Sequence, residues 1–127
     1  MSKYILEING IILFFKEKDV MSKWLEAVKK DPINIIDIPE DKKTLTICRA
    51  ALREDPMALY YVPTKYKSYH MCLDLVRRNG AVLEFVPEKY KSYELCFEAV
   101  KDYTYAIQFV PQEYKNDLKV RFNIIED

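Results

Sequence analysis

The sequence predicts a mainly α-helical fold, namely a short α-solenoid of about four 24-residue helix-turn-helix repeats with an N-terminal β-hairpin and, in one of two interpretations of the C-terminal segment, a strand. Two observations predict the repeats: a proline recurs every 24 residues, and a cysteine recurs with the same period in three of the units. A third observation, Asn9-Gly10 between two apolar runs, predicts the hairpin. The prolines are Pro39, Pro63, Pro87 and Pro111, and the cysteines are Cys48, Cys72 and Cys96.

The repeat period sets the expected boundaries. A chain of 127 residues, of which 50% are hydrophobic and 31% charged, is long enough to bury a continuous core, so we expect one compact domain. The hairpin is expected over residues 1–20, the helical repeats over 21–117 and a C-terminal element over 118–127. The four repeats are then residues 21–44, 45–68, 69–92 and 93–116.

The N-terminal hairpin is predicted to consist of residues 4–8 and 11–15. A type I′ turn needs positive φ at two positions, which Asn-Gly adopts readily. The resulting register makes one face of the ribbon wholly apolar, and an isolated hairpin is marginally stable in water. We therefore expect this face to be covered by the helices, by another strand, by a partner or by a second copy of the chain. It consists of Tyr4, Leu6, Ile8, Ile11, Leu13 and Phe15.

Each repeat is predicted to contain two helices. The first begins after a residue that can accept a hydrogen bond from the opening turn, at Thr44, Ser68, Ser92 and Asn116. Asp before Pro predicts the cap and first residue of the second helix, whereas Asn79-Gly80 predicts a left-handed helix end. The second helix ends at the recurrent proline, because the residue before proline disfavours helix.

The segment 118–127 fits two structures. Val120, Phe122 and Ile124 alternate with polar residues, which is typical of a strand. Asn116, at the cap position of its repeat, instead favours a further helix that caps the array. We favour the strand.

Three sequence stretches carry a resemblance to a known family. ELCFEAV and FVPQEYK, with LDLVRRNGAVLEFVPEKYKS one repeat earlier, resemble the short helical repeats of the bacterial domain-of-unknown-function family 4116. Its units read leucine-cysteine-x-x-alanine-valine and then leucine-x-phenylalanine-valine-proline. The match is good over residues 45–115 and looser over 24–43, where Trp24 replaces the cysteine and Asp37 an aromatic residue. The resemblance implies an α-solenoid of helix pairs and supplies no catalytic residues.

Several classes of function are disfavoured by composition. Twenty basic and twenty acidic residues give a net charge of zero, so no global field attracts nucleic acid or an acidic membrane. Neither a membrane-spanning run nor a signal peptide is recognised, and three cysteines at equivalent positions suit reduced thiols. We therefore expect a cytoplasmic protein without membrane contact.

An enzyme, a metal site and a bound cofactor are not expected. The serines that could act as nucleophiles are predicted caps, and the cysteines fill a predicted core position. His70 is the only histidine, so a histidine-rich metal site cannot be built. Two glycines seventy positions apart exclude a glycine-rich phosphate loop.

A row of lysines and tyrosines is the candidate binding site. Each lysine precedes an expected N-cap, where the helix dipole makes a cation slightly unfavourable, so folding alone does not call for it. Stacked repeats would align these residues along one edge, to contact a protein, to bind phosphates and bases, or simply to be solvated. This Lys/Tyr ladder consists of Lys43, Lys67, Lys91, Lys115, Tyr66, Tyr90 and Tyr114.

The expected function is that of a non-enzymatic protein-binding repeat module. Repeat arrays expose extended surfaces that bind other macromolecules, so an adaptor or an inhibitor occupying a surface of a larger bacterial protein fits, for example a blocker of a defence nuclease. The alternatives are a nucleic-acid-binding repeat protein that uses the Lys/Tyr ladder and, less favoured, an enzyme of unrecognised type. A homodimer joined through the hairpin is also expected as an option.

Overall fold

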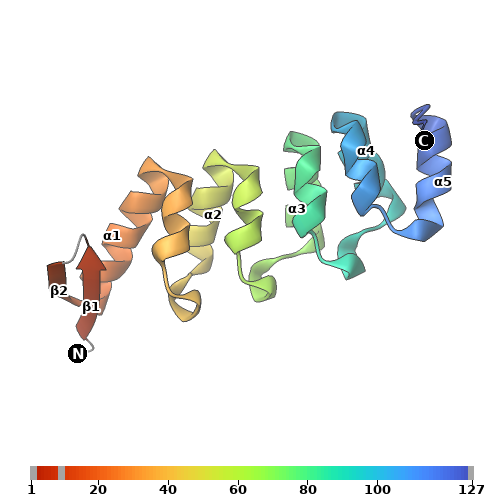
Figure 1. Cartoon of the computed structure of the whole chain (residues 1–127). Coiled ribbons are helices and arrows are strands. Elements are labelled where there is room, and N and C mark those ends of the chain that lie inside the picture. Colours follow the sequence, from red (N-terminus) through yellow and green to blue (C-terminus); the bar gives the residue numbers. More distant parts are fainter. Residues whose placement is uncertain (1–2, 9–10, 126–127) are drawn as a thin grey trace. The chain divides into compact units, whose positions relative to one another are not determined.

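The computed structural model describes residues 3–8 and 11–125, with side chains from Asp19 onward, and the chain is mainly helical as predicted (Figure 1). It divides into two compact units, Met1–Glu54 and Asp55–Asp127. The sequence predicted one compact domain, with repeat boundaries that do not include residue 55. Where packing contacts run mostly between neighbouring elements, no core shared by the whole chain is required.

Two strands, two α-helices and two 3-10 helices lie in the described part of the first unit. α1 contacts both strands and packs against α2, and η1 contacts both of these α-helices. The elements are β1 (Lys3–Ile8), β2 (Ile11–Lys16), α1 (Glu17–Lys30), η1 (Pro32–Asp37), η2 (Glu40–Lys42) and α2 (Leu45–Glu54).

β1 and β2 pair antiparallel. The register aligns Tyr4 with Phe15, Leu6 with Leu13 and Ile8 with Ile11. The expected turn at Asn9-Gly10 and the side chains of both strands lie outside the described part of the structure, so the apolar face of the hairpin stays a prediction. α1 begins at Glu17, four residues before the boundary expected from the repeat period.

The second unit repeats one arrangement along the chain. α3 packs against α4 and α4 against α5, and η5 contacts both η3 and η7 (Figure 1). The α-helices are α3 (Tyr69–Arg78), α4 (Tyr93–Asp102) and α5 (Gln112–Arg121). The 3-10 helices are η3 (Pro56–Tyr61), η4 (Thr64–Tyr66), η5 (Gly80–Phe85), η6 (Glu88–Tyr90) and η7 (Thr104–Phe109).

The second helix of each repeat is a 3-10 helix. Six residues lie between the cap and the turn before the proline, and short segments of this length are where the tighter i→i+3 bonding is common. The predicted Asp-Pro caps are confirmed: Asp31 accepts a hydrogen bond from the Ile33 N–H, and Asp55 accepts one from the Met57 N–H. Thr44, Ser68 and Ser92 cap α2, α3 and α4 in the predicted way.

Asn79-Gly80 does not form the predicted left-handed helix end. Asn79 is extended, with φ −154°, and its side chain accepts a hydrogen bond from the Ala81 N–H at 3.0 Å. It therefore caps η5 as the two aspartates cap η1 and η3. Gly80 is needed for a close approach, because a Cβ there would lie 2.1 Å from the carbonyl oxygen of Ala99 in α4.

α5 (Gln112–Arg121) and the turn after it occupy the described part of the C-terminal segment, so the favoured strand is wrong over residues 118–125. Asn116 lies inside α5 rather than at its cap, since the helix already begins after Pro111. Asn123, with φ 53°, ends it: its N–H donates to the Val120 carbonyl, and the Ile124 N–H donates to the Lys119 carbonyl, which is a Schellman motif. The apolar alternation that favoured a strand therefore runs along a helix and its cap.

The core follows the repeat. The cysteine position and one apolar position in each of η1, η3, η5 and η7 are buried. Within the described residues, none of the helices has the length and apolar character of a membrane span. These buried side chains are Trp24, Cys48, Cys72 and Cys96, followed in the 3-10 helices by Ile35, Leu59, Leu83 and Ile107.

Candidate protein-binding surface

The lysines of the Lys/Tyr ladder are largely held inside the fold. Lys43 and Lys91 are only 7% and 8% exposed, and Lys67 and Lys115 are half-buried. The Lys91 ammonium donates to Glu88 at 2.6 Å and to the Phe109 carbonyl at 3.0 Å. Lys67 donates to the Phe85 carbonyl at 3.2 Å, and Lys43 donates to Glu40 at 2.9 Å.

These bonds explain why the lysines are present. Phe85 and Phe109 are the last residues of η5 and η7, where helix carbonyls lack a partner within the helix and the dipole is negative. An ammonium group from the preceding loop supplies the missing donor. The interpretation that folding does not call for these lysines is therefore wrong for Lys67 and Lys91. Lys115 lies within α5, so the row does not continue there.

The tyrosines of the Lys/Tyr ladder are half-buried and covered by their neighbours. Lys65 lies over the Tyr66 ring at 5.1 Å from its centroid, and Lys89 lies over the Tyr90 ring at 5.0 Å. Tyr114 instead packs edge-on against Tyr93, with ring centroids 5.7 Å apart. Lys65 and Lys89 are thus the exposed lysines of these two loops. Each lies two residues before a lysine of the Lys/Tyr ladder. They are themselves 24 residues apart, so the repeat period could have identified them.

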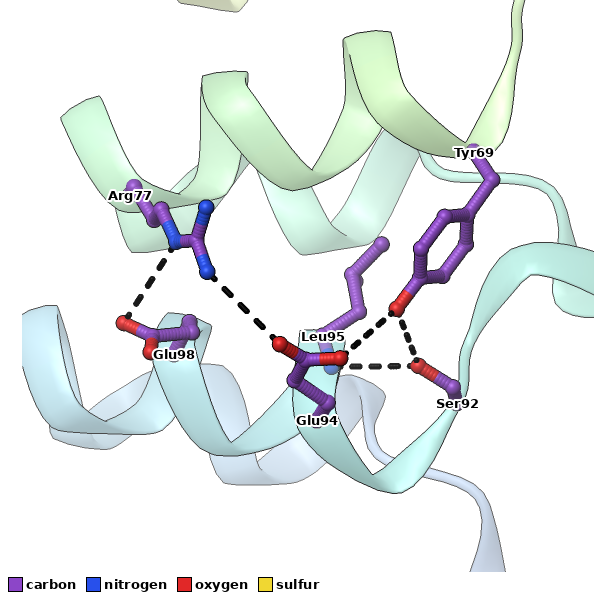
Figure 2. A network of polar contacts seen from close by, with 6 residues as sticks. All are labelled: Tyr69, Arg77, Ser92, Glu94, Leu95 and Glu98. Atoms are coloured by element: carbon purple, nitrogen blue, oxygen red, sulfur yellow. Dashed lines mark hydrogen bonds and ion pairs between the residues drawn. The ribbon is translucent and has the colours of Figure 1, made fainter.

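A polar network joins α3 to α4 (Figure 2). The Tyr69 hydroxyl hydrogen-bonds Ser92 at 3.0 Å, and it also donates to Glu94. Arg77 lies 3.7 Å from Glu94 and 4.0 Å from Glu98. Tyr93 donates in the same way to Asp117 of α5, and this bond raises the pKa of its phenol. These side chains join α3 to α4 and α4 to α5, so their contacts are explained by the packing of neighbouring helices.

The cysteines are buried and free, as predicted. Cys48, Cys72 and Cys96 are fully inaccessible, and burial raises the pKa of each thiol to about 11. A nearby lysine partly opposes this effect in each case, but desolvation is the larger cause. Thiols of this kind are poor nucleophiles, because the thiolate is the reactive form.

We predict slow labelling of the native protein by a thiol reagent. At pH 8 a thiol with a pKa near 11 has about a hundredfold less thiolate than one at its ordinary value, and burial slows the reaction further. Labelling followed by absorbance should be fast only in denaturant. Rapid native labelling of Cys72 would contradict its placement in the core.

The same thiols give stability a defined pH dependence. Their pKa is raised in the folded state, so the unfolded chain loses protons first as the pH rises. The free energy of unfolding should therefore fall between about pH 9 and 11. Urea denaturation with all three cysteines replaced by alanine should show a smaller fall over this range, and an identical fall would contradict the assignment.

The 3-10 helices of the second unit present a surface that sequence reasoning missed. Tyr60 is 62% exposed and Tyr105 is 72% exposed, and both project from short helices whose other sides are buried. Tyr60 packs edge-on against Tyr61 and Phe85, with ring centroids 4.9 and 5.1 Å away. The exposed and half-exposed side chains of η3, η5 and η7 form the 3-10 face: Pro56, Met57, Tyr60, Tyr61, Ala81, Glu84, Phe85, Thr104, Tyr105, Gln108 and Phe109.

The 3-10 face is poor in charge. Charged residues make up 31% of the chain, but η3, η5 and η7, of six residues each, contain a single one, Glu84. In the first unit η1 likewise exposes Ile33 and Ile36. Exposed aromatic residues with few charges are typical of the centre of a protein interface.

No set of three or more His, Cys, Asp or Glu side chains that could hold a metal occurs within the described residues.

A comparison with protein-family models finds a match within the second unit. Residues 70–115 match the family model described as Domain of unknown function (DUF4116), so the resemblance predicted from the repeat units is confirmed over this part of the chain. The match spans α3, η5, η6, α4 and η7 and ends within α5. No curated protein matches the chain, and no solved structure matches it.

Proposed function

We propose that this chain is a short α-solenoid that binds another protein through the 3-10 face and has no enzymatic activity. The observation that carries the proposal is the exposure of Tyr60 and Tyr105 on a surface that contains one charged residue. Large exposed aromatic side chains are unfavourable in water unless a partner covers them, and tyrosine is among the residues that contribute most to protein interfaces.

The other chemically capable side chains support a binding role because they serve the fold. The cysteines are buried and hard to ionise, Ser68 and Ser92 cap helices, and Lys67 and Lys91 bind helix carbonyls. An adaptor, or an inhibitor that covers a surface of a larger protein, is the role that such a surface suits. Array proteins commonly bind through an extended face built from successive repeats.

The nucleic-acid alternative receives less support. Phosphate binding would need exposed ammonium groups, but Lys91 is buried and Lys67 is half-buried. The exposed Lys65 and Lys89 each lie over a tyrosine ring on which a base would otherwise stack. A bound protein therefore fits this unit better than a bound nucleic acid.

Partner capture tests the proposal. Immobilised full-length protein and a Tyr60→Ser/Tyr105→Ser variant would be compared for retention of proteins from the lysate of the native host, identified by mass spectrometry. We expect the variant to lose a partner that the wild type retains, because most of the exposed aromatic area is removed. A Lys65→Ser/Lys89→Ser variant is the matched control and should retain it.

Two results would contradict the proposal. Retention of the same partner by the tyrosine variant would exclude the 3-10 face. Retention that disappears after nuclease treatment or in moderate salt, and that is lost in the Lys65→Ser/Lys89→Ser control, would favour the nucleic-acid alternative. Circular dichroism of each variant should remain that of the wild type.

A further inference from the structure

Glu84 is a carboxylate without a use inside the protein. It is exposed near the end of η5, the 3-10 helix that contacts both η3 and η7. It makes no hydrogen bond or ion pair with any other residue that the structure describes. Asp74 and Glu113 of the same unit are likewise exposed, but they lie on α3 and α5, whereas Glu84 is the one charged residue of η3, η5 and η7.

Folding does not explain this charge. Glu84 lies in the last turn of η5, where the negative end of the helix dipole makes a carboxylate slightly unfavourable. The equivalent residues of η3 and η7 are Tyr60 and Gln108, which are uncharged. The glutamate therefore contributes nothing evident to the stability of the repeat.

The surroundings of Glu84 are aromatic. Phe85 follows it in the chain, and the exposed Tyr60 ring packs edge-on against Phe85. No basic residue occurs in η3, η5 or η7, although the Lys67 ammonium of the preceding loop lies 3.2 Å from the Phe85 carbonyl. A carboxylate beside exposed aromatic rings attracts a cation, which can pair with the carboxylate and lie against a ring face.

Among protein cations, arginine fits this arrangement best. Its guanidinium is planar, binds a carboxylate through two parallel N–H bonds and stacks on aromatic rings. Lysine offers only a compact ammonium that is more strongly hydrated. Arginine is also enriched, with tyrosine, among the residues that dominate interface energies.

We infer that the partner segment bound by the 3-10 face presents an arginine, flanked by apolar side chains, that pairs with Glu84 beside Tyr60 and Phe85. This inference rests on the proposed function, and it adds the chemistry of the partner. The apolar flanks would cover the aromatic side chains of the 3-10 face, and the arginine would supply the one charge-complementary contact at its centre.

A peptide titration tests the inference. The probe is acetyl-Leu-Arg-Leu-amide, and its match is the same peptide with citrulline, which keeps the shape and removes the charge. Added to the isotope-labelled full chain and followed by amide NMR, the arginine peptide should shift residues 60, 84 and 85 and bind about tenfold more tightly than the citrulline peptide. Glu84→Gln should remove this difference, whereas Asp74→Asn, at an exposed carboxylate of α3, should preserve it.

Equal affinity for the two peptides would overturn the inference. Shifts confined to residues away from 60, 84 and 85, or no binding of either peptide up to about 10 mM, would overturn it as well. These outcomes concern the arginine alone. Loss of the captured partner in the Tyr60→Ser/Tyr105→Ser variant is measured separately. Protein binding by the 3-10 face can therefore be confirmed even if the inferred arginine is wrong.

Discussion

Replacing Gly80 by alanine should lower the free energy of unfolding by about 3 kcal/mol, because no space exists for the added methyl group. The new Cβ would lie 2.1 Å from the Ala99 carbonyl oxygen and 3.0 Å from the Tyr103 Cβ. The nearest obstacle is backbone of α4, so η5 must move away from that helix. The movement would also strain the bond from the Gly80 N–H to Asp102, now 2.7 Å long.

Urea denaturation followed by circular dichroism measures this effect. Ala81→Gly is the matched control, because Ala81 is the next residue and half-exposed, and removing its methyl group should cost less than about 1 kcal/mol. A Gly80→Ala variant as stable as the wild type would contradict the close packing of η5 against α4.

Replacing Lys91 by methionine should lower the free energy of unfolding by about 2 kcal/mol. Methionine fills much the same space but cannot donate a hydrogen bond, so the Phe109 carbonyl at the end of η7 loses its partner. Glu88 is 77% exposed and would be solvated, so the carbonyl accounts for most of the effect. The loss should be visible as a lower denaturation midpoint.

Lys89→Met provides the comparison for this variant. Lys89 lies two residues earlier in the same loop, is exposed, and contacts only the Tyr90 ring among the residues described. Its replacement should change stability by less than about 0.5 kcal/mol, as is usual for surface positions. Equal losses in the two variants would mean that Lys91 does not support the 3-10 helix of the following repeat.

The sequence predicted the mainly helical chain and the starts of α2, α3 and α4 well, because two independent markers kept one period. Ser68 and Ser92 cap helices in the predicted register, and the cysteines occupy the predicted core position. These features depend on short-range chemistry: a cap acts within three residues, and an apolar position every 24 residues shows which side faces inward. Local rules therefore identified the first helix of each repeat.

The lysines could not be interpreted from local rules. Lys91 precedes α4, and the dipole of that helix makes a cation there unfavourable, but its actual partner is a carbonyl 18 residues later in η7. Only the packing of one repeat on the next brings the two together. The left-handed helix end predicted at Gly80 was wrong for the same reason. Only glycine fits at this position because the Ala99 backbone of the following α-helix occupies the space of a side chain.

The strand predicted for the C-terminal segment was wrong because, over so short a length, alternation of apolar residues does not distinguish a strand from the end of a helix. Leu118 is fully buried against the preceding repeat, whereas Val120 is 80% exposed, a pattern that α5 and its cap produce. The 3-10 face was missed because exposure of Tyr60 and Tyr105 depends on how η3, η5 and η7 pack side by side. Their apolar sequences do not by themselves show which of these side chains face inward.

Site-specific photo-crosslinking tests the central claim most directly. A benzophenone amino acid would replace Tyr60 or Tyr105 on the 3-10 face, or Tyr66 or Tyr90 on the loops of the Lys/Tyr ladder, in the full chain within its native host. We predict crosslinks to one protein of defined mass from positions 60 and 105 and none from 66 and 90. Crosslinks from positions 66 and 90 alone would contradict the claim and return the binding site to the loops.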